Sequence, residues 1–362
     1  MKSFLLPRPN TSIHLLDKIM VITHILAGQG VFGGLEKHVV DLSAAQVRRG
    51  HRVYALTTAS MGVHFSDTVE VLPIRLYRPR WDPRLRNELK NKLLKIQPDV
   101  VHAHANKAAA VSGKLLRKMG LFSVATVQNI KKNQQMFAHF DRVIAASKMV
   151  AQSLADIPSS VIRNSVARPE STLREIAQAI KPPFLEHKGK IIYAAGRFVE
   201  AKGYDLLLEA IRDIPEAYLW LVGDGPDRQK IQSIIDKAYL NERVWLPGFL
   251  PVDQVLGLMQ LADLFVVSSR REGGPYTLSE ALRSRCPVIS TKVGFAPELL
   301  DEAQLCDSIT ASDISAKITS ALQDAAGYAQ SMQSVFDRAD VELDLEYMVD
   351  KVMEVYALGR TE

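Results

Sequence analysis

The chain has 362 residues and a mass of 40.2 kDa, which favours two domains over a single hydrophobic core. Its 47% hydrophobic and 23% charged residues exclude a disordered or fibrous protein. No apolar run reaches the roughly 18 residues of a membrane span, Pro7 and Pro9 interrupt any secretory signal, and two cysteines are too few for a disulfide framework. These features predict a cytoplasmic protein.

The net charge of +5 conceals two halves of opposite sign. Up to Glu170 the chain holds 25 Lys and Arg against 11 Asp and Glu, a net charge of +14, and the remainder holds 20 against 29, or −9. The basic half implies an anionic partner such as nucleic acid, an anionic membrane or a phosphorylated glycan. Because the other half is acidic and no nucleic-acid-binding motif is present, nucleic acid is not expected.

Short apolar runs alternate with amphipathic stretches along the chain, as in parallel sheets with crossover helices. The first half predicts strands at 18–26, 52–57, 99–103, 122–127 and 142–146, and helices at 35–49, 83–96 and 107–119. The second half predicts strands at 190–195, 218–222, 243–246, 264–267 and 288–290, and helices at 204–212, 227–239, 252–261 and 275–285.

This alternation predicts an α/β fold with two Rossmann-like, doubly wound domains, residues 1–168 and 169–340. The proline-containing stretch 168–188 is the predicted linker, and residues 341–362 supply a final amphipathic helix, 343–358, that can pack back on the first domain. In such folds the ligand site lies at the carboxyl ends of the strands, in the cleft between the domains.

The first strand runs into the glycine loop AGQGVFGG, which contains a G-x-G-x-x-G pattern at Gly28, Gly30 and Gly33. A dinucleotide site would need an acidic residue where the second strand ends, and that strand ends ALTTAS without one. Two interpretations remain: the amides of Gly33 and Gly34 approach a phosphate at a helix N-terminus, or the loop is a tight turn.

His102 and His104 end the third predicted strand, and the period of two places both imidazoles on one face. No third ligand stands at a recognisable spacing for zinc, so no metal is expected. One histidine can bind a substrate hydroxyl in the cleft while the other is structural, and His104, nearer the strand tip, is the predicted functional residue.

Charged residues follow two strands of the second half. Arg197 and Lys202 share the loop AGRFVEAKG and can clamp a diphosphate, although, for this loop taken alone, solvated loop charge is the better explanation. In SSRREGGPYTLSE, Pro275 can start a helix whose free amides at Tyr276, Thr277 and Leu278 form an anion site. Glu272 and Glu280 flank that site and can accept hydrogen bonds from sugar hydroxyls.

These motifs, with GGLE at 33–36, RGHRV at 49–53, VHAH at 101–104, GDGP at 223–226 and WLPGF at 245–249, occur in the order and spacing of the retaining glycosyltransferases of family four. The chain resembles that family from residue 18 to about residue 300. The resemblance implies the GT-B fold, in which two Rossmann-like domains face each other across a cleft.

The resemblance also implies a role for each matching residue. Arg197 and Lys202 would hold the donor diphosphate, Glu272 with the amides of Gly273 and Gly274 the transferred sugar, and Glu280 the ribose. The implied donor contacts further include Gly33, Gly34, Gly196, Gly248, Phe249, Pro275, Tyr276, Thr277 and Leu278, with His104 approaching the sugar or acceptor. Two positions depart from the family pattern, namely Ala167, where an acid is common, and Gln128, where histidine is common.

The sequence contains no D-x-D motif, so guanidinium, ammonium and helix amides would replace a metal ion, and no cofactor is expected. The predicted reaction moves a hexose or N-acetylhexosamine from a nucleotide-sugar, with UDP favoured, to an anionic cell-envelope glycan or glycolipid. A basic segment, residues 75–95, has a net charge of +6, and because Leu85, Leu89 and Leu93 follow helical spacing, the segment alone is better explained as a core helix with a solvated charged face. The net charge of +14 on the whole first half nevertheless predicts peripheral contact with an anionic membrane, at the inner face of the cytoplasmic membrane. The alternatives are an epimerase, a phosphorylase or a non-catalytic nucleotide-sugar-binding protein of the same fold.

Overall fold

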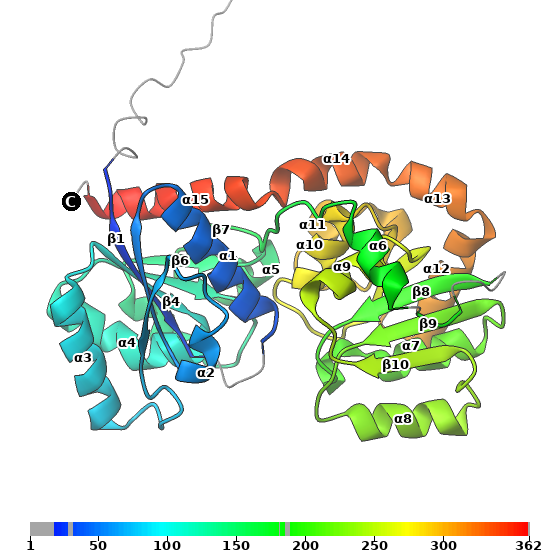
Figure 1. The fold of residues 1–362 in the computed structure, drawn as a ribbon, viewed down its shortest axis with the longest axis horizontal. Coiled ribbons are helices and arrows are strands. Elements are labelled where there is room, and N and C mark those ends of the chain that lie inside the picture. Colours follow the sequence, from blue (N-terminus) through cyan, green and yellow to red (C-terminus); the bar gives the residue numbers. More distant parts are fainter. Residues whose placement is uncertain (1–17, 28–31, 181, 185–188, 361–362) are drawn as a thin grey trace, which may run out of the picture.

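The computed structural model describes residues 18–27, 32–180, 182–184 and 189–360. Two α/β units lie side by side, each built on a central parallel sheet with helices on its faces (Figure 1). This is the doubly wound, two-domain architecture that the sequence predicts.

The first unit contains a seven-stranded parallel sheet in the order β3-β2-β1-β4-β5-β6-β7. Its strands are β1 (Val21–Leu26), β2 (Arg52–Thr57), β3 (Glu70–Pro73), β4 (Val100–His104), β5 (Ser123–Val127), β6 (Arg142–Ala145) and β7 (Ser160–Val161). Its helices are α1 (Gly34–Arg48), α2 (Ala59–Gly62), α3 (Pro83–Ile96), α4 (Ala105–Met119) and α5 (Lys148–Ser153), with a 3-10 helix at Gln135–His139. The central strands are buried on both faces, which explains their nearly continuous apolar sequences.

The second unit contains a five-stranded parallel sheet in the order β10-β9-β8-β11-β12. Its strands are β8 (Lys190–Ala195), β9 (Ala217–Val222), β10 (Val244–Gly248), β11 (Leu264–Val267) and β12 (Val288–Ser290). The helices are α6 (Leu173–Ala179), α7 (Tyr204–Arg212), α8 (Arg228–Lys237), α9 (Val252–Met259), α10 (Tyr276–Arg283), α11 (Ala296–Leu299), α12 (Ala311–Gln323), α13 (Ala325–Ser331) and α14 (Gln333–Glu342). Short 3-10 helices occupy Glu200–Lys202 and Glu302–Gln304, and a third, Leu358–Arg360, follows the last helix of the chain on the first unit.

The predicted linker, 168–188, is partly wrong, because it contains helix α6. Ala177 of α6 is fully buried in the core of the second unit, where it lies against Gly257 of α9. Strands β3 and β7, at the two edges of the first sheet, were not predicted either, because both are too short to show a period.

The chain crosses between the units twice, and the crossings lie together. The amide of Val166 donates to the carbonyl of Leu343 over 3.1 Å, so the segment that leaves the first unit touches the one that returns to it. Arg163 lies beside these crossings and pairs with Glu298 of α11 at 2.8 Å and with Glu342 of α14 at 2.5 Å. These contacts tie the two units at the hinge.

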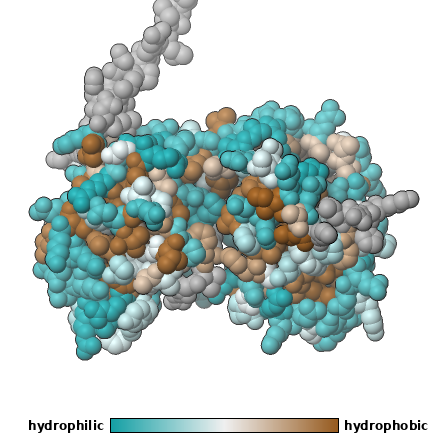
Figure 2. All heavy atoms as spheres, viewed as in Figure 1, coloured by the Kyte–Doolittle hydropathy of each residue, from teal (hydrophilic) through white to brown (hydrophobic). Residues whose placement is uncertain are grey.

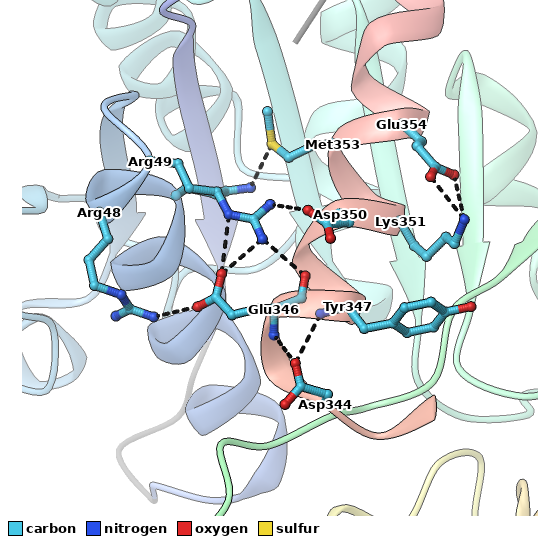
Figure 3. Close-up of polar contacts among 10 residues, drawn as sticks. Arg48, Arg49, Asp344, Glu346, Tyr347, Asp350, Lys351, Met353 and Glu354 are labelled. Atoms are coloured by element: carbon cyan, nitrogen blue, oxygen red, sulfur yellow. Dashed lines mark hydrogen bonds and ion pairs between the residues drawn. The ribbon is translucent and has the colours of Figure 1, made fainter. Parts of the chain in front are cut away.

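The last helix, α15 (Leu345–Ala357), packs on the first unit, and seven of its side chains join that unit's core. Two arginines at the end of α1 form ion pairs with the exposed side of α15. Arg48 and Arg49 both pair with Glu346, and Arg49 also pairs with Asp350 at 2.7 Å (Figure 3). The side chain of Glu346 is 52% exposed, so these pairs contribute roughly 0.2–1 kcal/mol each and the apolar face of α15 contributes most of the docking energy.

The surface seen in Figure 2 is mixed, with hydrophilic side chains covering the outer edges of both units. Among the residues that the structure describes, no helix combines the length and the apolar character needed to cross a bilayer.

Candidate active site

The loop between β11 and α10 carries Glu272 to Pro275 and packs directly against the first unit. A Cβ atom on Gly273 would lie 1.9 Å from the carbonyl oxygen of Gln128, and one on Gly274 would lie 2.9 Å from Cβ of Ala146. Glycine is required at both positions because any side chain would push the units apart. The loop therefore sits in the cleft, at the carboxyl ends of strands from both sheets.

Lys202 and Glu272, predicted from separate motifs, form an ion pair with Nζ 2.5 Å from Oε1. The same carboxylate oxygen accepts a hydrogen bond from Ser269 Oγ at 2.9 Å. The two side chains are 21% and 12% exposed, so each charge is largely removed from water and depends on its partner. The pair places an ammonium group and a carboxylate side by side at the cleft.

Arg197, the other predicted clamp residue, is exposed on the loop that follows β8. It lies close enough to Glu36 of α1 to lower the pKa of that carboxyl, although burial dominates and holds the pKa of Glu36 above its usual value. Glu36 in turn accepts a hydrogen bond from the amide of Gly33 at 3.1 Å. The first turn of α1 and the Arg197 loop thus face each other across the cleft.

The N-terminus of α10 corrects one prediction. The amide of Leu278 donates to the carbonyl of Pro275 over 3.1 Å, so it is not free to bind an anion. Pro275 is the N-cap of the helix rather than its first residue. The amides at Tyr276 and Thr277 stay in the predicted anion site.

Glu280 lies one turn further along α10 and is 6% exposed. Burial raises the pKa of its carboxyl to about 7, against the attraction of Lys37 and Lys202. Lys37 pairs with Asp41 at 2.6 Å, and Asp41 accepts a hydrogen bond from Tyr276 across the cleft at 2.7 Å. Glu280 therefore lies near the charged side chains of Lys37 and Asp41 on α1 of the opposite unit.

A hollow opens beside Glu280, with Lys37 on one side and Asp253 and Leu256 of α9 on the other. Residues 166–170, Thr172, Leu173 and Ile176 complete its lining. Gly248, with φ of +86°, ends β10, and the following Phe249 is 63% exposed on the same unit. The hollow thus lies beside Glu280, between α1 of the first unit and α9 of the second.

His104 and His102 do share a face, as predicted, with ring centroids 4.1 Å apart. Both are buried: His104 is 1% exposed and its Nε2 lies 2.9 Å from Nδ1 of His24. Burial holds the pKa of both rings well below the usual value. In this arrangement His104 lies under the surface of the cleft rather than on it.

A third imidazole, which the sequence patterns did not reveal, comes from the neighbouring strand. His24 of β1 stands opposite His102 of β4 in the sheet register, and ring nitrogens of His24, His102 and His104 lie within 4.8 Å of one another. This trio could hold a metal ion. However, each of their ring nitrogens except Nδ1 of His104 already has a hydrogen-bond partner, so an ion would have to replace existing bonds.

Asn164 is a cleft residue that the sequence motifs do not single out. The only signal near it is Ala167, where the family commonly has an acid. Its Nδ2 donates to the carbonyl of Gly274 at 2.8 Å, and its side chain pairs reciprocally with Gln128. Its own carbonyl accepts from Ser279 of α10 at 2.6 Å. Gln128, one of the two positions that depart from the family pattern, thus takes part in a connection between the first unit and the loop that carries Gly274.

Two further glycines among the predicted contacts have close neighbours in the structure. A Cβ on Gly196, which has a φ of +151°, would lie 2.8 Å from the hydroxyl oxygen of Tyr204 and 3.4 Å from Nζ of Lys202, so glycine makes room for both side chains. Gly34 lies against Tyr276, where a Cβ would come within 2.6 Å of Tyr276 Cβ. Gly28 and Gly30 lie outside the described residues, as do Pro7 and Pro9.

Two family models match the chain, one after the other. The model "Glycosyltransferase Family 4" matches residues 32–167, and "Glycosyl transferases group 1" matches residues 176–335. With two facing parallel α/β domains, these matches define the class as a GT-B glycosyltransferase. The chain belongs to the family-four, group 1 glycosyltransferases.

Solved structures agree on the fold. Sucrose-phosphate synthase from Thermosynechococcus elongatus superposes with a TM-score of 0.81 at 18% identity, covering 93% of this chain and 98% of that one. HepE from Anabaena, solved in complex with UDP and glucose, gives 0.79 at 18% identity and covers 93% of this chain and 99% of its own.

Curated relatives carry glycosyltransferase names. A phosphatidylinositol N-acetylglucosaminyltransferase subunit from Homo sapiens is 26% identical over 302 residues, 75% of this chain and 61% of that protein, so the chain matches less than two thirds of its length. The lipopolysaccharide core biosynthesis glycosyltransferase LpsE of Rhizobium meliloti is 26% identical over 277 residues, 75% of this chain and 79% of that protein.

Proposed function

We propose that this protein transfers a hexose or N-acetylhexosamine from a UDP-sugar to a cell-envelope glycan or glycolipid, with retention of the anomeric configuration. The observation that carries the proposal is the meeting of Lys202, Glu272 and the first amides of α10 in one cleft, with Arg197 on the same loop as Lys202. Cations and helix amides suit a diphosphate, and the carboxylate suits sugar hydroxyls.

The donor would extend along the cleft from this cluster. The diphosphate would lie between Arg197, Lys202 and the amides of Tyr276 and Thr277, and the ribose would reach Glu280 beside the hollow at α9. Phe249, exposed at the end of β10, would line the base. The uridine assignment is supported by the complex of HepE with UDP and glucose, and an N-acetylhexosamine by the name of the human relative.

Catalysis would stabilise the leaving diphosphate without a metal ion. Guanidinium, ammonium and helix amides supply fixed positive charge where negative charge develops. The acceptor would attack from the face that the diphosphate leaves, and a departing phosphate oxygen would take the acceptor's proton. Closure of the two domains would exclude water and so limit hydrolysis of the donor.

The acceptor would approach from the basic first domain. Helix α3 and the segment before it present Arg75, Arg84, Lys92 and Lys95 around one surface hollow, and Tyr77 and Trp81 nearby are 70% and 74% exposed. Leu85, Leu89 and Leu93 are core residues, so only the outer, charged face of α3 is available. This surface would hold the protein at the inner face of the cytoplasmic membrane, where a lipid-linked or lipopolysaccharide-core acceptor is found.

The test is a transfer assay with UDP-sugars and a panel of envelope acceptors, run beside a donor-only reaction. We expect release of UDP that depends on acceptor, and a product of the donor's anomeric configuration by proton NMR. Interconversion of the sugar without transfer would instead identify an epimerase. Donor binding without turnover on any acceptor would indicate a non-catalytic nucleotide-sugar-binding protein.

A further inference from the structure

Tyr204, the first residue of α7, has a buried hydroxyl group without a hydrogen-bond partner. The residue is 5% exposed, and its ring packs edge-on against Phe198 with ring centroids 5.5 Å apart, in the core of the second unit. Among the residues that the structure describes, none forms a hydrogen bond with the hydroxyl oxygen. Packing explains the aromatic ring but not the hydroxyl, because phenylalanine would fill the same position without leaving a buried polar atom unpaired.

The hydroxyl lies at the edge of the core, beside the loop that carries Lys202. A Cβ on Gly196 would lie 2.8 Å from the hydroxyl oxygen of Tyr204, 3.3 Å from Cε of Lys202 and 3.4 Å from its Nζ. The hydroxyl and the ammonium group therefore border the same point, directly after the carboxyl end of β8. Both groups are close enough to that point to bind one small anion together.

The hydroxyl keeps its proton and can donate it in a hydrogen bond. Burial, and after it the negative charge of Glu272, raises the pKa of Tyr204 above its usual value. The carboxylate of Glu272 is close, but its Oε1 already accepts from Lys202 and from Ser269 Oγ, and these two bonds hold it in place. The proton of the Tyr204 hydroxyl is therefore left for a ligand, and an oxygen anion is the acceptor that it would bind most strongly.

The neighbours of the hydroxyl indicate which part of the donor would reach it. Lys202 would hold the diphosphate and Glu272 the transferred sugar, and the two side chains are in contact with each other. Tyr204 lies beside both of them. The phosphate closest to the sugar is the β-phosphate, so this is the group that would lie between Lys202 and Tyr204.

We infer that Tyr204 is a further donor-binding residue, whose hydroxyl donates a hydrogen bond to the β-phosphate of the nucleotide-sugar beside the ammonium group of Lys202. The identity of this ligand rests on the proposed function. The contact forms when the side chain of Lys202, which borders the hydroxyl, turns from Glu272 to the diphosphate. Tyr204 then stabilises the same negative charge as Lys202.

Calorimetry with UDP and UMP on the full chain tests this contact. Tyr204→Phe removes only the hydroxyl, so it should weaken UDP binding by about tenfold, the scale of a hydrogen bond to a charged group. Binding of UMP, which lacks the β-phosphate, should not change. The matched control is Tyr328→Phe on α13 of the same unit, which removes a hydroxyl that donates to the carbonyl of Val288 at 2.8 Å and should leave UDP binding unchanged. Wild-type affinity for UDP in Tyr204→Phe, or equal weakening of UMP binding, would overturn the inference.

Urea unfolding of the protein without ligand gives a second readout. Tyr204→Phe should unfold at the same urea concentration as the wild type or at a higher one, because it removes an unpaired polar atom from the core. Tyr328→Phe should unfold at a lower concentration, because it breaks a hydrogen bond of the folded protein. Destabilisation of Tyr204→Phe to the same extent would overturn the inference, since the hydroxyl would then have a partner without the donor.

A panel of UDP, GDP, ADP and CDP separates failure of this inference from failure of the proposed function. The contact involves the shared diphosphate, so a wild type that binds another of these nucleotides instead of UDP contradicts the uridine assignment, and Tyr204→Phe is then compared with that nucleotide. Equal binding of a diphosphate by the wild type and Tyr204→Phe contradicts the role of Tyr204 alone. A wild type that binds none of the four contradicts both the donor site and the role of Tyr204.

Discussion

The two halves of the molecule carry opposite charge, and the predicted anion site is in the half with the unfavourable sign. The second half has a net charge of −9, yet it holds Arg197, Lys202 and the N-terminus of α10 in one cleft. The first half has a net charge of +14, and its densest basic segment, residues 75–95, follows β3 and continues along α3. The predicted phosphate site and the half with the favourable net charge therefore do not coincide.

We propose that local geometry, rather than net charge, decides where the diphosphate binds. An ammonium group paired with a carboxylate and placed beside helix amides binds one diphosphate in a fixed orientation. Scattered lysines and arginines on a helix surface act at longer range and suit an extended anionic surface. The four predictions below test this division, from the largest expected effect to the smallest.

Removal of the ammonium group from the donor cleft should have the largest effect. Lys202→Ala should lower kcat/KM by roughly a hundredfold or more, the cost of about 2–4 kcal/mol in transition-state stabilisation. Steady-state kinetics measures this, and added EDTA should leave the wild-type rate unchanged. The exposed Lys237→Ala on α8 is the matched control. Equal rates for the two variants would show that Lys202 does not stabilise the leaving diphosphate. Loss of wild-type activity in EDTA would show that the reaction needs a metal ion.

Ionisation of Glu280 should lower the free energy of unfolding of the second half as the pH rises. Its folded pKa of about 7 lies above the usual 4.5, so between these values the folded state retains a proton that the unfolded chain releases. Stability therefore falls from pH 4.5 to 7, and the full cost of about 3 kcal/mol is present above pH 7. Urea unfolding should show Glu280→Gln more stable than wild type at pH 8 and equal to it at pH 4.

The control for this pH dependence is the exposed Glu242→Gln on the same domain. A stability difference between Glu280→Gln and wild type that does not change with pH would contradict the assignment, because packing rather than ionisation would then be its cause.

Substitutions of Glu272 and Glu280 should differ in their effects on nucleotide binding. Glu280→Ala should weaken binding of free UDP by about tenfold, the scale of one hydrogen bond to a charged group. Glu272→Ala should leave UDP binding nearly unchanged and lower turnover, because its carboxylate would hold the sugar. Calorimetry with UDP measures the first effect. Equal weakening of UDP binding by both substitutions would contradict the assignment of the ribose to Glu280 and of the transferred sugar to Glu272.

The smallest effect concerns the basic surface of the first half. Each basic residue near an anionic leaflet contributes roughly 1 kcal/mol, so the wild type should co-sediment with anionic vesicles at low salt and release at high salt. Reversal of Arg80, Arg84 and Arg86 to Glu should weaken sedimentation without changing UDP binding. Reversal of Lys114, Arg117 and Lys118 on α4 makes the same charge change elsewhere on that domain and should weaken it less. Equal sedimentation on neutral vesicles would exclude an electrostatic surface.

The strands and long helices were predictable because their apolar periods are long enough to read. Helix α6 was missed because prolines surround it and its single fully buried residue, Ala177, reveals its face only against α9. His24 was missed because it joins His102 through strand register between β1 and β4, which are separated by three helices and two strands in the sequence. The bond from the amide of Leu278 depends on where α10 begins, and helix ends are set within a residue by local geometry.

The most direct test of the central claim is a titration of UDP into isotope-labelled protein, followed at backbone amides. The account predicts that the largest shifts fall in the acidic half, at Lys202, Tyr276, Thr277 and Glu280, and that the amides of α3 stay in place. Shifts concentrated on the basic surface of α3, with none around Glu272 and Glu280, would contradict the account.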